Sequence, residues 1–343
     1  MTETPFFPDA ASSLAPRVDA VFFVLMAITV FFTALIGFLV MYFAIRYRKG
    51  AQVDRTHAHS TSFALEATWI GVPLVIVLGI FAIGTQVFFE LFNPPKDATP
   101  IYVIGKQWMW KVQHPQGRQE INEIHLPAGR PVRLIMTSQD VIHSFFVPAF
   151  RVKQDVLPGR LTSEWFEPMK PGKYHLFCAE YCGTEHSKMG GWAYVMDPTD
   201  YQRWLKGTTT DATGATGSSD SGPAMADSGA RLFEKYHCSG CHGVNSQFRA
   251  PKLAGVYGNQ VPVMKPDGKG VDFVVADDKY IRDSILLPQS HIVAGFGTEV
   301  DRSQSPTGYR SVMPSYKDVL KEEEVLQLME YIKSIGRKEG TDR

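Results

Sequence analysis

Two long runs without a charged residue constrain this chain more than any other feature. The first covers residues 20–45 and the second covers residues 67–89. As α-helices, both are long enough to cross a hydrocarbon core of about 30 Å. Buried core helices of a soluble protein are the alternative, but both runs exceed the usual globular helix and lack amphipathic spacing. We therefore predict a transmembrane helix hairpin within residues 20–95.

The loop between the two runs predicts the orientation of the hairpin. It contains four basic residues, Arg46, Arg48, Lys49 and Arg55. The positive-inside rule places such a short basic loop in the cytoplasm, so both ends of the chain are expected outside. Residues 1–19 are polar and contain prolines, which predicts an extracytoplasmic segment with no cleavable signal. The first membrane helix is then expected to act as the export signal.

The composition changes after Asn93-Pro94-Pro95, which ends the second helix. Residues 96–206 contain short runs rich in Val, Ile, Tyr, Phe and Trp that are broken by Pro and Gly. This pattern predicts an all-β sandwich or barrel. A helix is expected at its end, over residues 199–206.

The last third of the chain begins with a low-complexity segment. Residues 207–228 consist almost wholly of Gly, Ser, Thr, Ala and Asp, a composition typical of a flexible linker. Residues 229–343 are expected to form a small α-helical domain. Amphipathic helices are predicted near its two ends, over residues 229–236 and 322–335.

Four cysteines follow the second membrane helix, where the environment is oxidising and two disulfides would be usual. Their spacing favours cofactors instead. Cys178 and Cys182 lie four residues apart among His and Met, and Cys238 and Cys241 belong to a Cys-x-x-Cys-His motif. We therefore expect both pairs to hold cofactors.

The first pair belongs to a set of soft ligands. Cys178, Cys182, His186 and Met189 lie within twelve residues, and His143 is available in a strand-like run upstream. Such ligands suit copper or zinc and exclude calcium or magnesium as the main ion. A single-copper site needs only one Cys, so the second thiolate predicts a bridge to a second copper. The alternative is a structural zinc site with two cysteines and two histidines, and the thioether of Met189 counts against it.

The second pair, in Cys238-Ser-Gly-Cys241-His242, is a signature of c-type haem attachment. Two thiols add to the haem, and the adjacent histidine binds the iron. A redox-active cysteine pair is the alternative, but no thioredoxin-like βαβ pattern surrounds it. A sixth ligand is needed for an electron carrier, and the candidates are Met313, in Val-Met-Pro-Ser-Tyr, and Met264, in a loop rich in Pro, Gly and Lys. The position of Met313 before the last predicted helix favours it.

These motifs resemble those of two known families. The chain up to about residue 206 resembles cytochrome c oxidase subunit II with its copper A domain, and residues 229–337 resemble a class I cytochrome c. Together they resemble the fused subunit II of bacterial caa-type haem-copper oxidases. The resemblance implies a cupredoxin-like Greek-key sandwich, a small all-α cytochrome c domain, a covalent haem c and binuclear copper A. It also implies a ligand set for the two coppers: His143, Cys178, Cys182, His186, Met189 and the backbone carbonyl of Glu180.

The same resemblance implies further roles. The Glu180 side chain matches a carboxylate that binds magnesium at the interface with subunit I. Trp108 matches an aromatic point of electron input, although a packed strand tryptophan is the alternative. Glu66, at the start of the second membrane helix, matches a glutamate at the mouth of a proton-uptake channel, although a charge solvated at the membrane surface explains it equally.

The resemblance implies a function in a complex. Electrons are received at haem c, pass through copper A and leave for haem a in subunit I, where oxygen is reduced to water with proton translocation. The expected partners are subunits I and III, membrane lipid, and either a soluble cytochrome c or a quinol:cytochrome c reductase-type complex as donor. The net charge is zero and no nucleic acid partner is expected. The expected location is the bacterial inner membrane, as a multi-pass protein with both cofactor domains on the periplasmic side.

Four other functions remain as alternatives at this stage. Copper A domains also resemble inputs to a nitric oxide reductase, which is the main alternative, and the electron-input domain of nitrous oxide reductase, which the membrane anchor and fused haem disfavour. A metal-storage or copper-delivery protein would be expected to expose exchangeable Met and Cys clusters. A quinol oxidase subunit II shares the anchor and the β domain but lacks the copper ligands.

Overall fold

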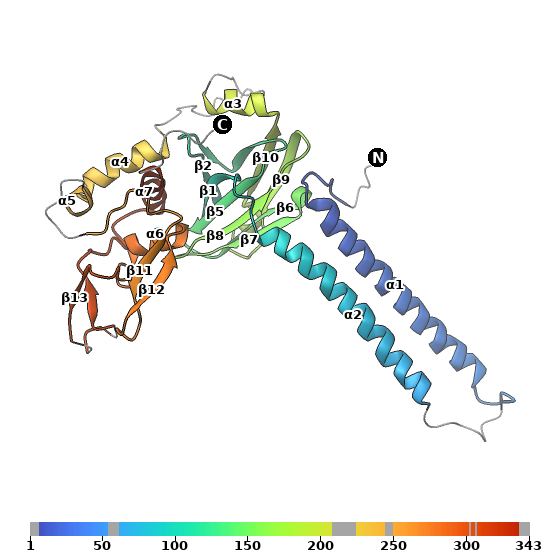
Figure 1. Ribbon diagram of the computed structural model, residues 1–343. Helices are drawn as coiled ribbons and strands as arrows, with labels where there is room; N and C mark the ends of the chain where they lie inside the picture. The colour runs from blue at the N-terminus through green and yellow to red at the C-terminus, as the bar shows by residue number, and fades with distance from the viewer. Residues whose placement is uncertain are drawn as a thin grey trace.

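The chain is described here from a computed structural model (Figure 1). The structure describes residues 7–53, 62–207, 224–243, 250–301, 303–305 and 307–335. These residues form a pair of long helices, a β-sandwich and a C-terminal domain made mainly of helices. Most of the predicted linker, residues 208–223, lies outside the described residues.

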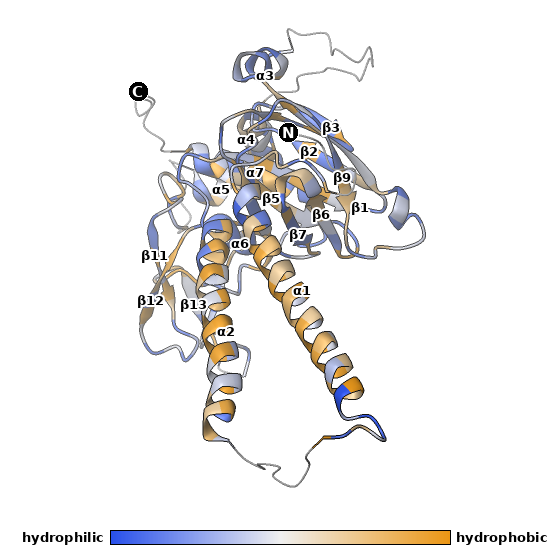
Figure 2. Ribbon diagram, turned by 90° about the vertical axis from the view of Figure 1, so that its right-hand side faces the viewer, coloured by the Kyte–Doolittle hydropathy of each residue, from blue (hydrophilic) through white to orange (hydrophobic). Residues whose placement is uncertain are grey.

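Two helices, α1 (Ala15–Arg46) and α2 (Phe63–Phe92), form the expected membrane hairpin. Their 32 and 30 residues, at a rise of 1.5 Å per residue, extend about 48 and 45 Å. Apolar side chains are exposed around both helices, and the orange colour of their ribbons in Figure 2 marks these residues as hydrophobic. Such a surface suits lipid and not water. Both helices extend several residues beyond the uncharged runs, because charged residues at helix ends can reach the membrane surface.

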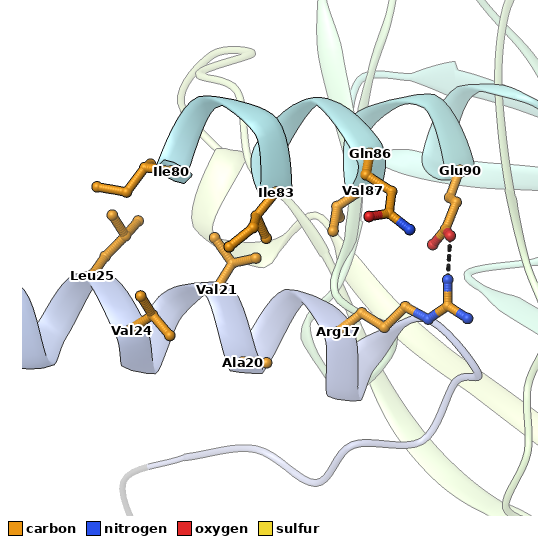
Figure 3. Close-up of a pocket in the computed structure, with 10 residues that line it drawn as sticks. All are labelled: Arg17, Ala20, Val21, Val24, Leu25, Ile80, Ile83, Gln86, Val87 and Glu90. Atoms are coloured by element: carbon orange, nitrogen blue, oxygen red, sulfur yellow. Dashed lines mark ion pairs between the residues drawn. The ribbon is translucent and has the colours of Figure 1, made fainter. Parts of the chain in front are cut away.

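The two helices meet where they reach the sandwich (Figure 3). Arg17 of α1 and Glu90 of α2 form an ion pair there, beside an apolar groove of about 420 Å³. Ala11, just before α1, donates its N–H to the carbonyl of Ala149 at 2.8 Å, and Trp165 Nε1 donates to the carbonyl of Glu90 at 2.9 Å. The start of α1 and the end of α2 therefore both pack on the sandwich, and the end of α1 and the start of α2 lie at the far end of the hairpin.

The sandwich consists of two five-stranded sheets, ordered β3-β2-β1-β5-β8 and β4-β10-β9-β6-β7. Apolar residues that alternate along the strands fill the interior, and Val103, Trp110, Leu134 and Phe145 are fully buried there. Neighbouring strands are antiparallel except in the pairs β1–β5 and β4–β10. This is the predicted cupredoxin-like sandwich. The strands of the two sheets are β1 (Thr99–Lys106), β2 (Met109–Gln113), β3 (Gln119–Ile121), β4 (Glu123–Pro127), β5 (Val132–Ser138), β6 (His143–Val147), β7 (Val152–Val156), β8 (Thr162–Phe166), β9 (Gly172–Cys178) and β10 (Gly190–Met196).

Short helices complete this domain. Two 3₁₀ turns, η1 (Pro148–Phe150) and η2 (His186–Lys188), lie in its loops. Helix α3 (Pro198–Leu205) follows β10, one residue earlier at each end than predicted. Its Tyr201 and Trp204 are buried against His114, with ring centroids 6.1 and 5.1 Å away.

The C-terminal domain is helical, as predicted, and also contains two short antiparallel hairpins. Helices α4 and α7 cross closely, and a Cβ on Gly229 of α4 would lie 2.0 Å from the Gln327 carbonyl oxygen of α7. Only glycine permits this approach. The elements are α4 (Met225–Lys235), α5 (Ser239–His242), β11 (Gln260–Met264), β12 (Val271–Val275), α6 (Asp278–Leu286), β13 (Gly297–Glu299), β14 (Tyr309–Ser311) and α7 (Glu322–Ser334).

One boundary differs from the prediction. Helix α4 begins at Met225 instead of residue 229. The small and polar residues 226–228 resemble the linker in composition, but the side chain of Met225 is buried in the core of the C-terminal domain. Tertiary burial therefore extends the helix into a segment whose composition predicts no structure.

Candidate functional site

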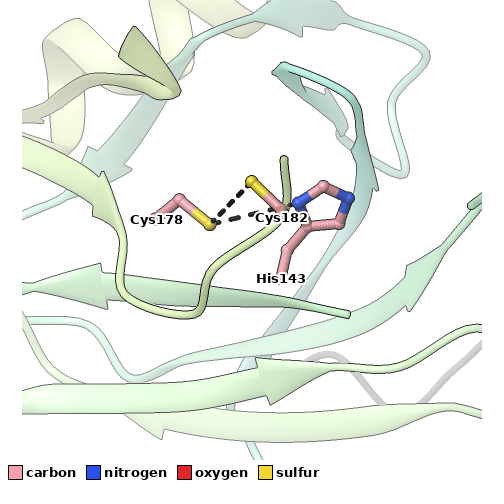
Figure 4. Close-up of side chains that lie close together, drawn as sticks. All are labelled: His143, Cys178 and Cys182. Carbon is pink, nitrogen blue, oxygen red and sulfur yellow. Dashed lines mark hydrogen bonds between the residues drawn. The ribbon is translucent and has the colours of Figure 1, made fainter. Parts of the chain in front are cut away.

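The residues predicted to bind copper converge at one end of the sandwich (Figure 4). His143 begins β6, Cys178 ends β9, and these two strands pair with each other. Cys178 Sγ lies 4.0 Å from His143 Nδ1 and 3.7 Å from Cys182 Sγ. Cys182 Sγ lies 3.5 Å from His186 Nδ1 and 3.7 Å from Met189 Sδ. The fold thus brings five soft or borderline donor atoms into one cluster.

The burial of this cluster fits a closed copper site. His143, Cys178, Cys182 and Met189 are at most 8% exposed, and both cysteines are free. The Glu180 carbonyl oxygen lies 3.3 Å from Cys178 Sγ, while the Glu180 side chain is exposed. Two thiols, two imidazoles and a thioether are the donor types that copper prefers in electron-transfer sites.

The two thiols differ in acidity. Burial opposes ionisation of Cys178, but hydrogen bonds with His143 and with nearby backbone groups outweigh it and lower the pKa of this thiol to about 6. Burial and the neighbouring charge of Cys178 raise the pKa of Cys182 to about 12. Two adjacent thiolates are therefore unfavourable unless a metal cation lies beside them.

Two residues that were not singled out in the sequence hold the predicted copper ligands in position. Asp140 Oδ1 accepts a hydrogen bond from His143 Nε2 at 2.8 Å, which leaves Nδ1 facing Cys178. Gln107 donates its backbone N–H to Asp140 Oδ2 and its Nε2 to the Cys182 carbonyl, both at 2.8 Å. The Asp-x-x-His spacing could have identified Asp140. Gln107 is 75 residues from Cys182, so no local signal could have identified it.

The loop between β9 and β10, which carries Cys182, His186 and Met189, is called the copper loop below. Trp108 lies beside this loop, in the turn between β1 and β2. A Cβ on Gly183, which follows Cys182 and has φ of +122°, would lie 3.1 Å from the Trp108 ring. Glycine therefore lets the copper loop lie directly against the indole. The role of Trp108 in electron input stays a prediction.

The haem motif occupies a short turn after α4. Cys238 is half-buried and Cys241 is exposed, and both lie at or within α5. His242 Nδ1 donates to the carbonyl oxygen of Pro251 at 2.9 Å, which leaves Nε2 free to bind iron. Two accessible thiols and an imidazole held in one tautomer fit covalent haem attachment. Residues 244–249, which follow the motif, lie outside the described residues.

The two candidates for the sixth haem ligand lie in different settings. Met313 is half-buried in the segment between β14 and α7, and its N–H donates to Ser311 Oγ at 3.2 Å. Met264 ends β11, and its N–H donates to the Ile292 carbonyl at 2.8 Å. The assignment of Met313 stays a prediction.

Glu66 does not join either cluster. It lies in the first turn of α2 and is half-buried, whereas the other end of α2 leads into the sandwich. Its position at one end of a membrane helix is the expected one, and its role in proton uptake stays a prediction.

A membrane hairpin, a cupredoxin-like sandwich with clustered sulfur and imidazole donors, and a domain with a c-type haem motif define a membrane-anchored electron-transfer protein. Cytochrome c oxidase subunit 2 of Thermostichus vulcanus is 30% identical to this chain, over 60% of this chain and 79% of that protein. The chain belongs to the cytochrome c oxidase subunit II family.

Three family models match successive parts of the chain. They describe the transmembrane domain of cytochrome c oxidase subunit II (residues 2–86), its periplasmic domain (118–193) and cytochrome c (226–336). Cytochrome c oxidase subunit 2 of Alkalihalophilus pseudofirmus is 28% identical over 79% of this chain and 73% of its own length. The crystal structure of the periplasmic domain of subunit II of cytochrome oxidase of Bradyrhizobium japonicum is 32% identical, over 33% of this chain and 95% of that chain, with a TM-score of 0.32.

Proposed function

We propose that this chain is the electron-input subunit of a cytochrome c oxidase. It accepts electrons at haem c and passes them through binuclear copper A to haem a of subunit I, where oxygen is reduced to water with proton translocation. One observation carries the proposal. Two buried thiols, two imidazoles and a thioether converge within contact distance in a chain that also has a c-type haem motif.

The residues of the copper cluster are suited to electron transfer because they do not need to move. Two coppers would be held by Cys178, Cys182, His143, His186, Met189 and the Glu180 carbonyl. Copper bound there would supply reversible one-electron chemistry. Strand pairing fixes His143 and Cys178, and Asp140 fixes the imidazole ring. A ligand set held in this way keeps nearly the same geometry in both oxidation states.

The haem residues have corresponding roles. Cys238 and Cys241 would hold the haem covalently, and His242 and Met313 would bind its iron. Such a haem would supply a second one-electron carrier, with no open position for oxygen. The hydrogen bond from His242 to Pro251 orients the imidazole and strengthens it as a ligand.

Three further residues receive proposed roles. Trp108 contacts the copper loop through Gly183, which supports a role in electron input to copper. The exposed carboxylate of Glu180 would bind magnesium together with subunit I, because the carbonyl of the same residue faces the copper cluster. Glu66, near the far end of the hairpin, would take protons from the cytoplasm.

The same features support a location and a set of partners. Since the start of α1 and the end of α2 pack on the sandwich, the N-terminal segment and both cofactor domains share one side of the membrane. Three basic residues at the other end of the hairpin, Arg46, Arg48 and Lys49, favour the periplasm for this side and the inner membrane as the location. Subunits I and III would be its neighbours, and a soluble cytochrome c or a reductase-type complex its donor.

Metal analysis combined with low-temperature electron paramagnetic resonance tests the copper assignment. We expect two coppers that share one unpaired electron, whereas one zinc would reject the site. Removal of copper with haem c retained tests the order of transfer. Haem c should still be reduced while oxygen consumption stops, and turnover with copper verifiably absent would refute the order.

A further inference from the structure

The C-terminal domain packs on the outer face of the sandwich sheet that contains β1 and β5. Four consecutive residues of β1, Ile101 to Ile104, are fully buried. A sheet with one face in water would show alternating burial. Here Ile101 and Val103 face the sandwich core, while Tyr102 and Ile104 belong to the same apolar cluster as Leu328 and Met329 of α7, which lies beside β1.

Charged residues surround a tyrosine at the centre of this interface. The Tyr102 hydroxyl donates to Glu330 of α7 and accepts a hydrogen bond from Lys333 Nζ at 2.7 Å. Lys333 Nζ also lies 2.5 Å from Asp278 Oδ1, and Asp278 Oδ2 lies 3.3 Å from Arg133 Nη1 of β5. Lys333 and Asp278 are almost fully buried. Separation of the domains would break the hydrogen bonds of Tyr102 and the contact of Asp278 with Arg133, and it would expose the shared apolar cluster to water.

A second contact lies beside the copper ligands. The Glu323 carboxylate, in the first turn of α7, accepts hydrogen bonds from Lys111 Nζ at 2.7 Å and from Gln139 Nε2 at 2.9 Å. Gln139 directly precedes Asp140, which holds the imidazole of His143. This contact lies at the edge of a cleft of about 700 Å³ that residues of both domains line.

Both described ends of the linker are attached to one hairpin of the sandwich. The turn between β2 and β3 binds α3 through a hydrogen bond from Arg118 to the Trp204 carbonyl at 3.2 Å. The same turn binds the start of α4, where Met225 donates its N–H to the Pro115 carbonyl at 2.9 Å. The segments before and after the linker therefore start from neighbouring points on the sandwich.

We propose that the haem domain works as a body docked on the copper domain, with Tyr102 as the anchor and Glu323 as a positioning residue that holds α7 against the sandwich next to Asp140. A linker alone would supply only a high local concentration. The role of Glu323 in electron transfer rests on the proposed function. The docking itself does not, so the two fail in different experiments.

The docking is tested by cutting the linker. A protease site is introduced between Gly207 and Ala224, and the full chain, loaded with copper and haem, is cleaved in detergent and passed through gel filtration. We expect the haem absorbance to remain with the copper domain. The double variant Tyr102→Ala, Arg133→Glu removes the anchor and faces Asp278 with a like charge across the interface, so it should release the haem domain with an unchanged haem spectrum. Release of the haem domain from the otherwise unchanged chain would overturn docking, and so would retention in this double variant.

The positioning role is tested by charge reversal. Glu323→Lys should slow electron transfer from haem c to copper, followed by stopped-flow absorbance, by about tenfold, which corresponds to about 1.4 kcal/mol. The double variant Lys111→Glu, Glu323→Lys restores an ion pair with opposite polarity and should recover most of the rate. Glu299→Lys, on the distant hairpin β13–β14, is the matched control and should have no effect.

The copper paramagnetic signal should be the same in all these variants, because none removes a copper ligand. An unchanged rate in Glu323→Lys, or no recovery in the folded double variant, would overturn the positioning role. In the chain without substitutions, the haem domain could stay bound after linker cleavage while no electron passes from haem c to copper before cleavage. In that case the proposed function fails while docking stands.

Discussion

The residues proposed to bind copper and those proposed to bind haem differ in how far apart they lie in the sequence and in how deeply they are buried. The copper set extends from His143 to Met189, and four of its side chains are at most 8% exposed. The haem motif occupies residues 238–242, with one cysteine half-buried and the other exposed. The difference matches the chemistry, because a haem must reach its thiols for covalent attachment, whereas a copper pair is best held by ligands that cannot move.

Replacement of one bridging thiol should have the largest effect and should separate the two sites. Cys182 Sγ lies within 3.7 Å of donor atoms on Cys178, His186 and Met189. Cys182→Ser should abolish the two-copper signal and lower oxidase activity by more than about a hundredfold, because loss of a ligand exceeds the 10- to 100-fold loss typical of its supporting groups. Metal analysis and oxygen consumption measure the outcome.

Cys241→Ser is the matched variant in the haem motif. It should reduce covalent haem, seen on denaturing gels, and leave the copper content unchanged. If either substitution empties both sites, the two regions are not independent in the way that their geometry indicates.

Loss of Asp140 should have the next largest effect, on copper alone. Asp140 holds the His143 ring through a 2.8 Å hydrogen bond. Asp140→Ala should lower copper affinity by about 10- to 100-fold, as expected for a residue that supports a ligand. Competition with a copper chelator measures the affinity. Asp140→Asn keeps a hydrogen-bond acceptor, so its copper affinity should lie between those of the unaltered chain and Asp140→Ala. Equal copper affinities in all three proteins would show that Asp140 does not support the site.

Addition of one methyl group at Gly229 should lower the stability of the haem domain. A Cβ on Gly229 would lie 2.0 Å from the Gln327 carbonyl, so Gly229→Ala should destabilise the haem domain by about 1 to 3 kcal/mol. Denaturant unfolding followed by haem absorbance measures this loss. Gly240→Ala is the control, because nothing lies within 4 Å of a Cβ at that position. Equal stability of the two variants would contradict the close crossing of α4 and α7.

The smallest predicted effect concerns a buried carboxyl in the copper domain. Burial raises the pKa of Glu164 well above its usual value of 4.5, and neither carboxylate oxygen has a hydrogen-bond partner among the described residues. Because the folded-state pKa is the higher one, the folded state binds the extra proton. The contribution of Glu164 to the free energy of unfolding is therefore greatest below pH 4.5, and it falls as the pH rises toward the folded-state pKa.

Glu164→Met removes both the unpaired oxygens and the titration. It should raise the free energy of unfolding at pH 8 by about 1 kcal/mol or more, with a smaller gain at pH 5. Thermal unfolding of the copper domain signal measures the gain, and Glu164→Gln should remove the pH dependence alone. A larger gain at pH 5 than at pH 8 would contradict the raised pKa.

The membrane hairpin, the sandwich and both cofactor motifs could be predicted from the sequence because each depends on local composition or on spacing within a few residues. Uncharged runs specify membrane helices, and a Cys-x-x-Cys-His motif is complete within residues 238–242. The start of α4 could not be predicted, since residues 226–228 look like linker and only the burial of Met225 in the domain core makes them helical.

What only the tertiary structure decided are contacts between residues far apart in the chain. Gln107 supports the loop of Cys182 from 75 residues away, and Tyr102 meets Glu330 of α7 from 228 residues away. No periodicity or spacing records such pairs, because they arise when whole sheets and helices pack against one another. The amino-acid sequence by itself determined the two motifs proposed to hold cofactors. The packing decided which residues keep those motifs, and the two domains, in place.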